Sequence, residues 1–362
     1  MIRPPEYVAS IKPYVPGKPI EELERELGIK GSIKLASNEN PLGPSPLALE
    51  AIRNIAHDLN RYPDGSGFYL RNALAQMLSV AQEHIILGNG SNELLDIAVR
   101  TFMRPGDEAV MASPSFVVYP LSVQSMGCKA VQVPLKAYTH DLSSMCDAVT
   151  DKTRIFFIAN PNNPTGTINR RIEFDKLMER LPDGILLVMD EAYYEYVTNP
   201  EYADSMKHFR EGRDILILRT FSKIYGLAGL RIGYGIAKTE ILTEMHKLRP
   251  PFNTNSLSQV AALKALDDRD HVEKSLEVNE KGKKFLYMEL GRLGYEYVQT
   301  EANFVYIQVR DAMDLYERLL RKGVIIRPMG PNAVRVTIGI PQENERFIAA
   351  MEEEAWEKKE NL

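Results

Sequence analysis

The sequence predicts an α/β protein with a large domain, built on a mostly parallel sheet flanked by helices, and a smaller α+β domain. Three observations predict this fold. The chain has 362 residues, which is more than one compact core usually supports. Between residues 35 and 237, short apolar runs alternate with stretches of helical periodicity. After Pro250 and Pro251, long charged helical stretches take over, so we expect a second domain there.

Six short apolar runs in the middle of the chain are the expected strands of the large sheet. Nearly all of them lack alternation of apolar and polar residues, which is typical of parallel strands that helices cover on both faces. The runs are residues 84–87, 108–112, 154–159, 185–189, 215–218 and 232–236. The helical stretches between them, such as residues 93–102, are expected to be the crossover connections.

The two ends of the chain depart from this pattern. The first ~30 residues are rich in proline before a short helix expected at 20–27, so they form an arm that must dock elsewhere. Residues 267–290 predict a long helix, followed by strands expected at 304–309 and 333–338. We therefore divide the chain into an N-terminal arm with a small-domain segment (1–35), a large domain (36–262) and a small domain (263–362).

Composition argues against several classes of protein. The chain is 44% hydrophobic and 26% charged, which is near the average for folded proteins, so disorder is not expected. Its net charge of -5, with both signs interspersed, argues against nucleic acid or an anionic membrane as the main partner. The N-terminus lacks an apolar signal core and no apolar run reaches membrane-spanning length. We expect a cytoplasmic protein with small-molecule ligands.

Cysteine and histidine do not form metal-binding motifs in this sequence. Cys128 and Cys146 lack metal-ligand spacing, and neither is flanked by a histidine. The six histidines are scattered along the chain. We expect two reduced thiols and no metal.

Residues 88–92 (GNGSN) follow an expected strand and directly precede an expected helix. The two glycines allow the backbone to turn closely past a ligand, and the amides of Gly90, Ser91 and Asn92 would lie at the positive end of the helix dipole. This arrangement favours a phosphate site. Ser91 could also cap the helix without any ligand, so the motif alone leaves both interpretations open.

Residues 160–166 (NPNNPTG) follow the expected strand 154–159, at the edge where open α/β sheets bind ligands. A rigid turn that breaks the strand is the simpler interpretation. The segment nevertheless holds three asparagines beside its two prolines, which favours a side-chain amide that contacts a ligand.

Asp190 ends the very apolar run 185–189 and is followed by Glu191, Ala192 and Tyr193. A carboxylate at the edge of a buried sheet needs a cationic partner to offset its desolvation. A protonated ring nitrogen would serve as that partner. A helix cap formed by Asp190 is the alternative.

Lys223 follows the expected strand 215–218, among small residues that would exclude water. Such a position favours a lowered amine pKa and Schiff-base chemistry. Arg231 offers a bidentate fork for a phosphate that Ser222 could also contact. Alone, Lys223 could be an ordinary surface charge, so the functional interpretation depends on the four motifs together.

In order and spacing, the four motifs resemble those of the fold-type I, aspartate-aminotransferase-like enzymes that use pyridoxal 5′-phosphate (PLP). The most specific part is residues 220–234 (TFSKIYGLAGLRIGY), which resemble the PLP-attachment signature of the class II aminotransferases. Residues 36–43 (ASNENPLG), 60–64 (NRYPD) and 335–339 (RVTIG), together with Arg327, resemble the histidinol-phosphate aminotransferase subfamily.

The resemblance implies roles for the cofactor site. Lys223 would carry PLP covalently, and Asp190 would pair with the pyridine nitrogen and keep it protonated. Tyr193 and Asn163 would bond the phenolic oxygen of the ring. Phe116 would stack on the ring face, where the family more often has tyrosine. The phosphate would be held by Gly90, Ser91, Asn92, Ser222 and Arg231, with Tyr62 reaching over from a second subunit.

The resemblance also implies the assembly, the substrates and the reaction. A site completed by Tyr62 of another subunit implies a homodimer. Arg335 would clamp an amino-acid carboxylate, whereas Arg327 and Tyr14 would contact a substrate phosphate. The implied reaction is ping-pong transamination between an amino donor and a 2-oxo acid, with histidinol phosphate and glutamate as the amino compounds.

Two alternatives stay open at this point, and a third is disfavoured. An aromatic-amino-acid aminotransferase of the same subfamily would share every cofactor motif, and a threonine-phosphate decarboxylase would share the fold and a phosphorylated substrate. A PLP-binding transcriptional regulator would need an extra DNA-binding domain, for which this chain has neither the length nor a basic helix-turn-helix segment.

Overall fold

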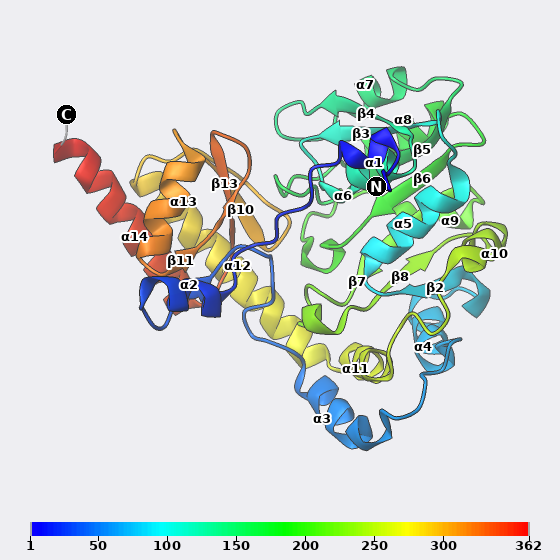
Figure 1. Cartoon of the computed structure of the whole chain (residues 1–362), viewed down its shortest axis with the longest axis horizontal. Helices are drawn as coiled ribbons and strands as arrows, with labels where there is room; N and C mark the ends of the chain where they lie inside the picture. Colours follow the sequence, from blue (N-terminus) through cyan, green and yellow to red (C-terminus); the bar gives the residue numbers. More distant parts are fainter. Residues whose placement is uncertain (1, 361–362) are drawn as a thin grey trace.

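The largest sheet has seven strands in the order β2-β8-β7-β6-β5-β3-β4. The computed structural model describes residues 2–360, and Figure 1 shows this sheet twisting through the larger part of the molecule. Strand β8 runs antiparallel to both neighbours, while the other strands run parallel to one another. The strands are β2 (Ile85–Gly88), β3 (Glu108–Ser113), β4 (Lys129–Pro134), β5 (Thr153–Ala159), β6 (Leu186–Asp190), β7 (Ile215–Thr220) and β8 (Gly233–Ile236).

The six strands expected from the sequence are present, with ends shifted by one or two residues. The sequence did not predict β4, which lies at the sheet edge and has several exposed or half-buried residues. The central strands are buried on both faces. In β5, Phe156 and Ile158 enter one hydrophobic core, whereas Ile155 and Phe157 enter the other. This two-sided burial explains the absence of polar alternation.

Helices cover both faces of this sheet. One core is formed with α5 (Ser91–Phe102), α6 (Val118–Ser125) and α10 (Thr239–Leu248). The helices that pack on the opposite face are α3 (Pro46–Ile55), α4 (Phe68–Leu78), α7 (Leu142–Asp147), α8 (Arg171–Arg180), α9 (Ser205–Arg210) and α11 (Ser256–Asp267). The carboxyl ends of the parallel strands form the edge at which open α/β sheets bind ligands.

A second, smaller group of elements has its own core around Leu286, Val305, Val336 and Phe347. Its antiparallel sheet has the order β12-β13-β10-β9, and β1 pairs with β11 in parallel. The strands are β1 (Ile33–Lys34), β9 (Tyr297–Val298), β10 (Phe304–Gln308), β11 (Val324–Ile325), β12 (Arg327–Pro328) and β13 (Ala333–Thr337). The helices are α12 (Arg269–Arg292), α13 (Ala312–Arg321) and α14 (Pro341–Glu360).

The N-terminal segment runs between the two groups. Figure 1 shows α1 (Glu6–Ala9) beside α6 at the large sheet and α2 (Ile20–Leu27) beside the smaller group. The Gln124 amide donates to the Tyr7 carbonyl, which fastens α1, and Leu23 of α2 packs with Ile325. The predicted division into residues 36–262 and 263–362 stays a prediction. Within the described part of the chain, the helices are too short or too polar to cross a membrane.

Candidate active site

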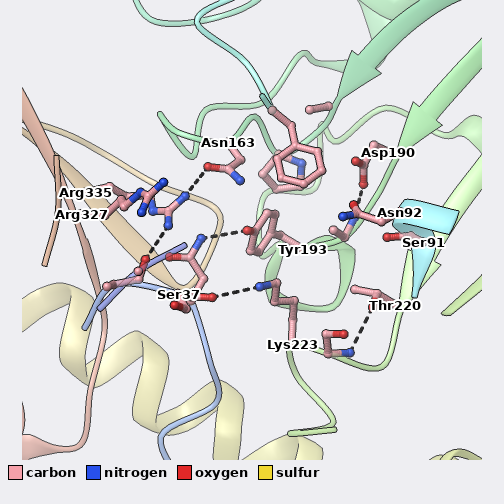
Figure 2. A pocket seen from close by; sticks show the side chains of 18 of the residues that line it. Ser37, Ser91, Asn92, Asn163, Asp190, Tyr193, Thr220, Lys223, Arg327 and Arg335 are labelled. Carbon is pink, nitrogen blue, oxygen red and sulfur yellow. Dashed lines mark hydrogen bonds between the residues drawn. The ribbon is translucent and has the colours of Figure 1, made fainter. Parts of the chain in front are cut away.

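A cavity of about 280 Å³ lies where the carboxyl ends of β5, β6 and β7 face β13 and the N-terminal segment (Figure 2). Its walls hold four basic side chains and one carboxylate, although the whole chain is acidic. The residues that line it are Tyr14, Gly17, Ala36, Ser37, Asn38, Ser91, Asn92, Phe116, Tyr119, Ala159, Pro161, Asn163, Asp190, Ala192, Tyr193, Thr220, Ser222, Lys223, Arg231, Arg327 and Arg335.

Lys223 lies in the turn that follows β7. Its Nζ donates to the Ser37 carbonyl at 3.1 Å and lies 5.6 Å from the centre of the Tyr193 ring. Burial, and then the nearby Arg335 charge, lower the pKa of Lys223 to about 8. A larger fraction of this amine is therefore neutral at physiological pH than for an ordinary lysine, which suits a nucleophile or a base.

Asp190 is the last residue of β6 and is 7% exposed. Its Oδ2 accepts from the Tyr119 hydroxyl at 2.7 Å and its Oδ1 from the Ala192 amide at 3.1 Å. Burial raises the pKa of Asp190, and these hydrogen bonds lower it in part. Within residues 2–360 this carboxylate forms no ion pair, so it is a buried charge that a cationic ligand would stabilise. No helix begins at Asp190, so the helix-cap interpretation is wrong.

An anion cradle forms at the start of α5. Helix α5 begins at Ser91, and Gly90 precedes it with φ +76°. The backbone angle favours glycine, and a Cβ at Gly90 would come within 2.6 Å of the Arg231 guanidinium and displace it. The Arg231 Nη1 in turn donates to the Ser222 hydroxyl at 3.3 Å. The helix terminus, a hydroxyl and a guanidinium thus converge on one end of the cavity.

Asn163, Tyr193 and Arg335 form the opposite wall. The Arg335 guanidinium donates to Asn163 Oδ1 at 2.5 Å and to the Ala36 carbonyl at 2.7 Å, while its Nε has no partner. The Tyr193 hydroxyl accepts from the Asn38 amide at 2.8 Å. Arg335 is buried, with only 8% of its surface exposed, and yet it has no carboxylate partner among the described residues. A buried arginine without a carboxylate predicts an anionic ligand.

Arg327 lies at the mouth of the cavity on β12. Its Nη2 donates to the Val15 carbonyl at 2.7 Å, and its guanidinium lies 5.3 Å from the centre of the Tyr14 ring. The N-terminal segment therefore forms part of the cavity wall, and Tyr14 enters the site from it.

Most of the site residues expected from the sequence meet in this cavity, with two exceptions. Gly90 lies beneath Arg231 without lining the space. Tyr62 is 82% exposed and stacks on Phe252 at 4.7 Å between ring centres, outside the cavity. The polar residues of the cavity that were missed include Asn38, which lies inside the ASNENPLG motif, and Tyr119, which follows Phe116 by three residues.

The family model for aminotransferase class I and II matches residues 30–351. This chain belongs to the class I and II aminotransferase family. Histidinol-phosphate aminotransferase of Moorella thermoacetica is 51% identical to this aminotransferase, covering 96% of this chain and 92% of that one. Histidinol-phosphate aminotransferase 1 of Nitrosococcus oceani is 49% identical, covering 95% of each chain. These similarities confirm the resemblance seen in the motifs.

Solved structures confirm the predicted fold class of this aminotransferase. Histidinol-phosphate aminotransferase from Sinorhizobium meliloti, in complex with pyridoxal-5′-phosphate, superposes with a TM-score of 0.91 at 27% identity, covering 99% of this chain and 98% of that one. L-threonine-O-3-phosphate decarboxylase from Porphyromonas gingivalis has a TM-score of 0.78 at 23% identity, covering 88% and 98%. The second similarity shows a shared fold and no more.

Proposed function

We propose that this chain is a PLP-dependent aminotransferase of histidine biosynthesis, which converts histidinol phosphate and 2-oxoglutarate to imidazole acetol phosphate and glutamate. One observation carries the proposal: a cavity with four basic side chains and one buried carboxylate joins a lysine of lowered pKa to an anion cradle. This set matches a phosphorylated cofactor and anionic substrates. The names of the relatives support the choice of substrate.

The residues at the strand ends fit PLP. The α5 terminus with Gly90, Ser91 and Asn92, joined by Ser222 and Arg231, would hold its phosphate. Asp190, which has no cationic partner in the described chain, would face the ring nitrogen. Phe116 would stack on the ring, and Asn163 and Tyr193 would bind the ring oxygen. When bound, PLP supplies an aldehyde that accepts the amino group and a ring that withdraws electrons from the substrate Cα.

The side chains then divide the proton chemistry between them. Lys223 would carry the cofactor, and its Nζ, with a pKa of about 8, would take the proton from the substrate Cα. Asp190 would keep the proton on the ring nitrogen by charge. Asn38 donates to the Tyr193 hydroxyl and fixes its direction. Catalysis thus needs an amine that loses its proton easily and a carboxylate that keeps its charge.

The other end of the cavity would bind the substrate. Arg335, buried and without a carboxylate partner among the described residues, would clamp the carboxylate of glutamate. Arg327 and Tyr14, at the mouth, would contact the phosphate of histidinol phosphate. Two separate arginines allow one pocket to accept both compounds in turn.

We propose further that the active unit is a homodimer whose site is completed by Tyr62 of the second subunit. Tyr62 is exposed and already fixed by stacking on Phe252, so it is presented to a partner without filling the cavity of its own chain. Phe68 and Tyr69 are exposed on the adjacent helix α4. Aromatic side chains grouped on a surface favour a protein interface.

The test of this function is a comparison of histidinol phosphate with phenylalanine as donor to 2-oxoglutarate. We expect kcat/KM to be clearly higher for histidinol phosphate, and accumulation of pyridoxamine phosphate on addition of the donor alone. Preference for phenylalanine would favour an aromatic aminotransferase, and release of CO₂ from threonine phosphate would favour a decarboxylase. Borohydride reduction of the PLP-loaded protein, followed by peptide mapping, should place the pyridoxyl group on Lys223.

A further inference from the structure

Two hydrogen bonds from the protein hold the carboxylate of Asp190. The Tyr119 hydroxyl donates to Oδ2 and the Ala192 amide donates to Oδ1. The Ala192 amide is backbone and belongs to the same turn as Asp190. Tyr119 belongs to helix α6, 71 residues away in the chain, so it is the contact that fixes Asp190 relative to another element.

The Tyr119 hydroxyl has little freedom to point elsewhere. Its side chain is 1% exposed, and its ring stacks on Phe157 at 4.8 Å between centres, with the planes 7° apart. Phe116 meets the same ring edge-on at 5.5 Å. The Tyr119 ring thus packs against Phe157 of β5 and against Phe116, the residue expected to stack on the cofactor.

This hydroxyl is a donor to Asp190 and stays one throughout the physiological pH range. Burial and the adjacent Asp190 charge raise the pKa of Tyr119 well above its ordinary value, so its proton is retained. A neutral donor to a buried carboxylate stabilises the charged form, which burial alone disfavours. Two nearby charges also act on Asp190: the Glu191 carboxylate raises its pKa and the Lys223 amine lowers it.

We infer that Tyr119 is a positioning residue that keeps Asp190 ionised and directed into the cavity, so that the carboxylate is ready for a cationic ring nitrogen. The inference depends on the proposed PLP site and adds a residue to it. If Tyr119 served only in packing, its ring alone would suffice. The positioning role requires its hydroxyl, which acts through Asp190.

The first test uses the protein without PLP. Infrared difference spectra between native protein and Asp190→Asn identify the carboxylic-acid band of Asp190, and its pH titration gives the protonation midpoint. We expect the midpoint to lie below neutral pH in the native protein and to rise by about one to two pH units in Tyr119→Phe, the shift for a lost charge-assisted hydrogen bond. An Asp190 that is already protonated at neutral pH in the native protein, or an unchanged midpoint in Tyr119→Phe, would overturn the inference.

The second test is a double-mutant cycle on PLP affinity, measured by equilibrium dialysis. Tyr119→Phe should weaken PLP binding by about tenfold or more in the native background, and by less than about threefold in Asp190→Asn, because the charge it serves is then absent. Equal losses in both backgrounds would assign Tyr119 to packing. Tyr196→Phe, which removes another buried hydroxyl from outside the cavity, is the matched control and should leave PLP affinity unchanged.

The outcomes separate this inference from the proposed function. A protein that passes both tests but does not transaminate histidinol phosphate would contradict the substrate and support the role of Tyr119. An active histidinol-phosphate aminotransferase with equal losses in the cycle would support the function and overturn the role of Tyr119.

Discussion

Replacing Arg327 with glutamine tests which compound enters the mouth of the cavity. Arg327 donates one N–H to the Val15 carbonyl, and its guanidinium lies over the Tyr14 ring. Its second Nη has no protein partner among the described residues. If that free edge binds a substrate phosphate, its loss leaves a partly desolvated charge unpaired, which typically costs about 2–5 kcal/mol. Because Arg327 is half-buried, we take the lower end, about 2 kcal/mol, or roughly 30-fold in kcat/KM.

The loss from Arg327→Gln should depend on the donor. Steady-state kcat/KM for histidinol phosphate should fall by roughly 30-fold, while any activity with phenylalanine should change by only a small factor. Arg321→Gln is the control, because Arg321 is exposed at the end of α13 and lies outside the cavity. Equal losses for both donors, with a lower melting temperature, would refute the phosphate contact. Arg327 would then serve only to fasten the N-terminal segment through Val15.

Three further predictions concern stability and assembly. Burial lowers the pKa of Lys223 from 10.5 to about 8, so the folded protein holds this proton less tightly than the unfolded chain. Lys223→Met should therefore stabilise the PLP-free protein by about 3 kcal/mol below pH 8, and this gain should vanish as the pH approaches 10.5. An unchanged urea midpoint at pH 7 would contradict this prediction. Glu191→Gln should destabilise the protein by about 3–5 kcal/mol because it leaves Arg219 buried and unpaired. Asp190→Asn in PLP-free protein should instead be neutral or stabilising, because burial disfavours the charge of Asp190. Equal urea denaturation curves for the two variants would contradict this difference. Mixing inactive Lys223→Ala with an inactive Tyr62 variant should restore some activity by forming one complete shared site, and no recovery after demonstrated subunit exchange would exclude sharing.

The cofactor end of the site could be predicted from sequence because its residues follow strands. Asp190 is the last residue of β6 and Lys223 lies in the turn after β7, and parallel strands bring their carboxyl ends to one edge of the sheet. Gly90 and Arg231 belong to short motifs next to strands in the same way. Local pattern and one general rule of α/β topology therefore suffice to group them.

The residues that the sequence did not reveal depend on tertiary contacts. Asn38 meets the Tyr193 hydroxyl across 155 residues, from a backbone with φ +55°, and nothing in its local pattern predicts that pairing. Tyr119 lies in the mostly apolar helix α6, where an aromatic residue is expected to be core. Its ring is indeed core, and only its hydroxyl reaches the site. A sequence pattern describes the side chain as a whole and cannot separate these two parts.

The adjacent carboxylates Asp190 and Glu191 illustrate the same limit. Both are buried, and the apolar run before them does not show which of the two carboxylates is paired within the protein. Arg219 pairs with Glu191 at 2.8 Å, and the Ser205 hydroxyl also bonds it, so this carboxylate is neutralised within the protein. That ion pair ties the end of β6 to β7, the strands that precede Asp190 and Lys223 in the cavity. Asp190 is left with neutral donors only, and its stabilisation by a cation must come from a ligand.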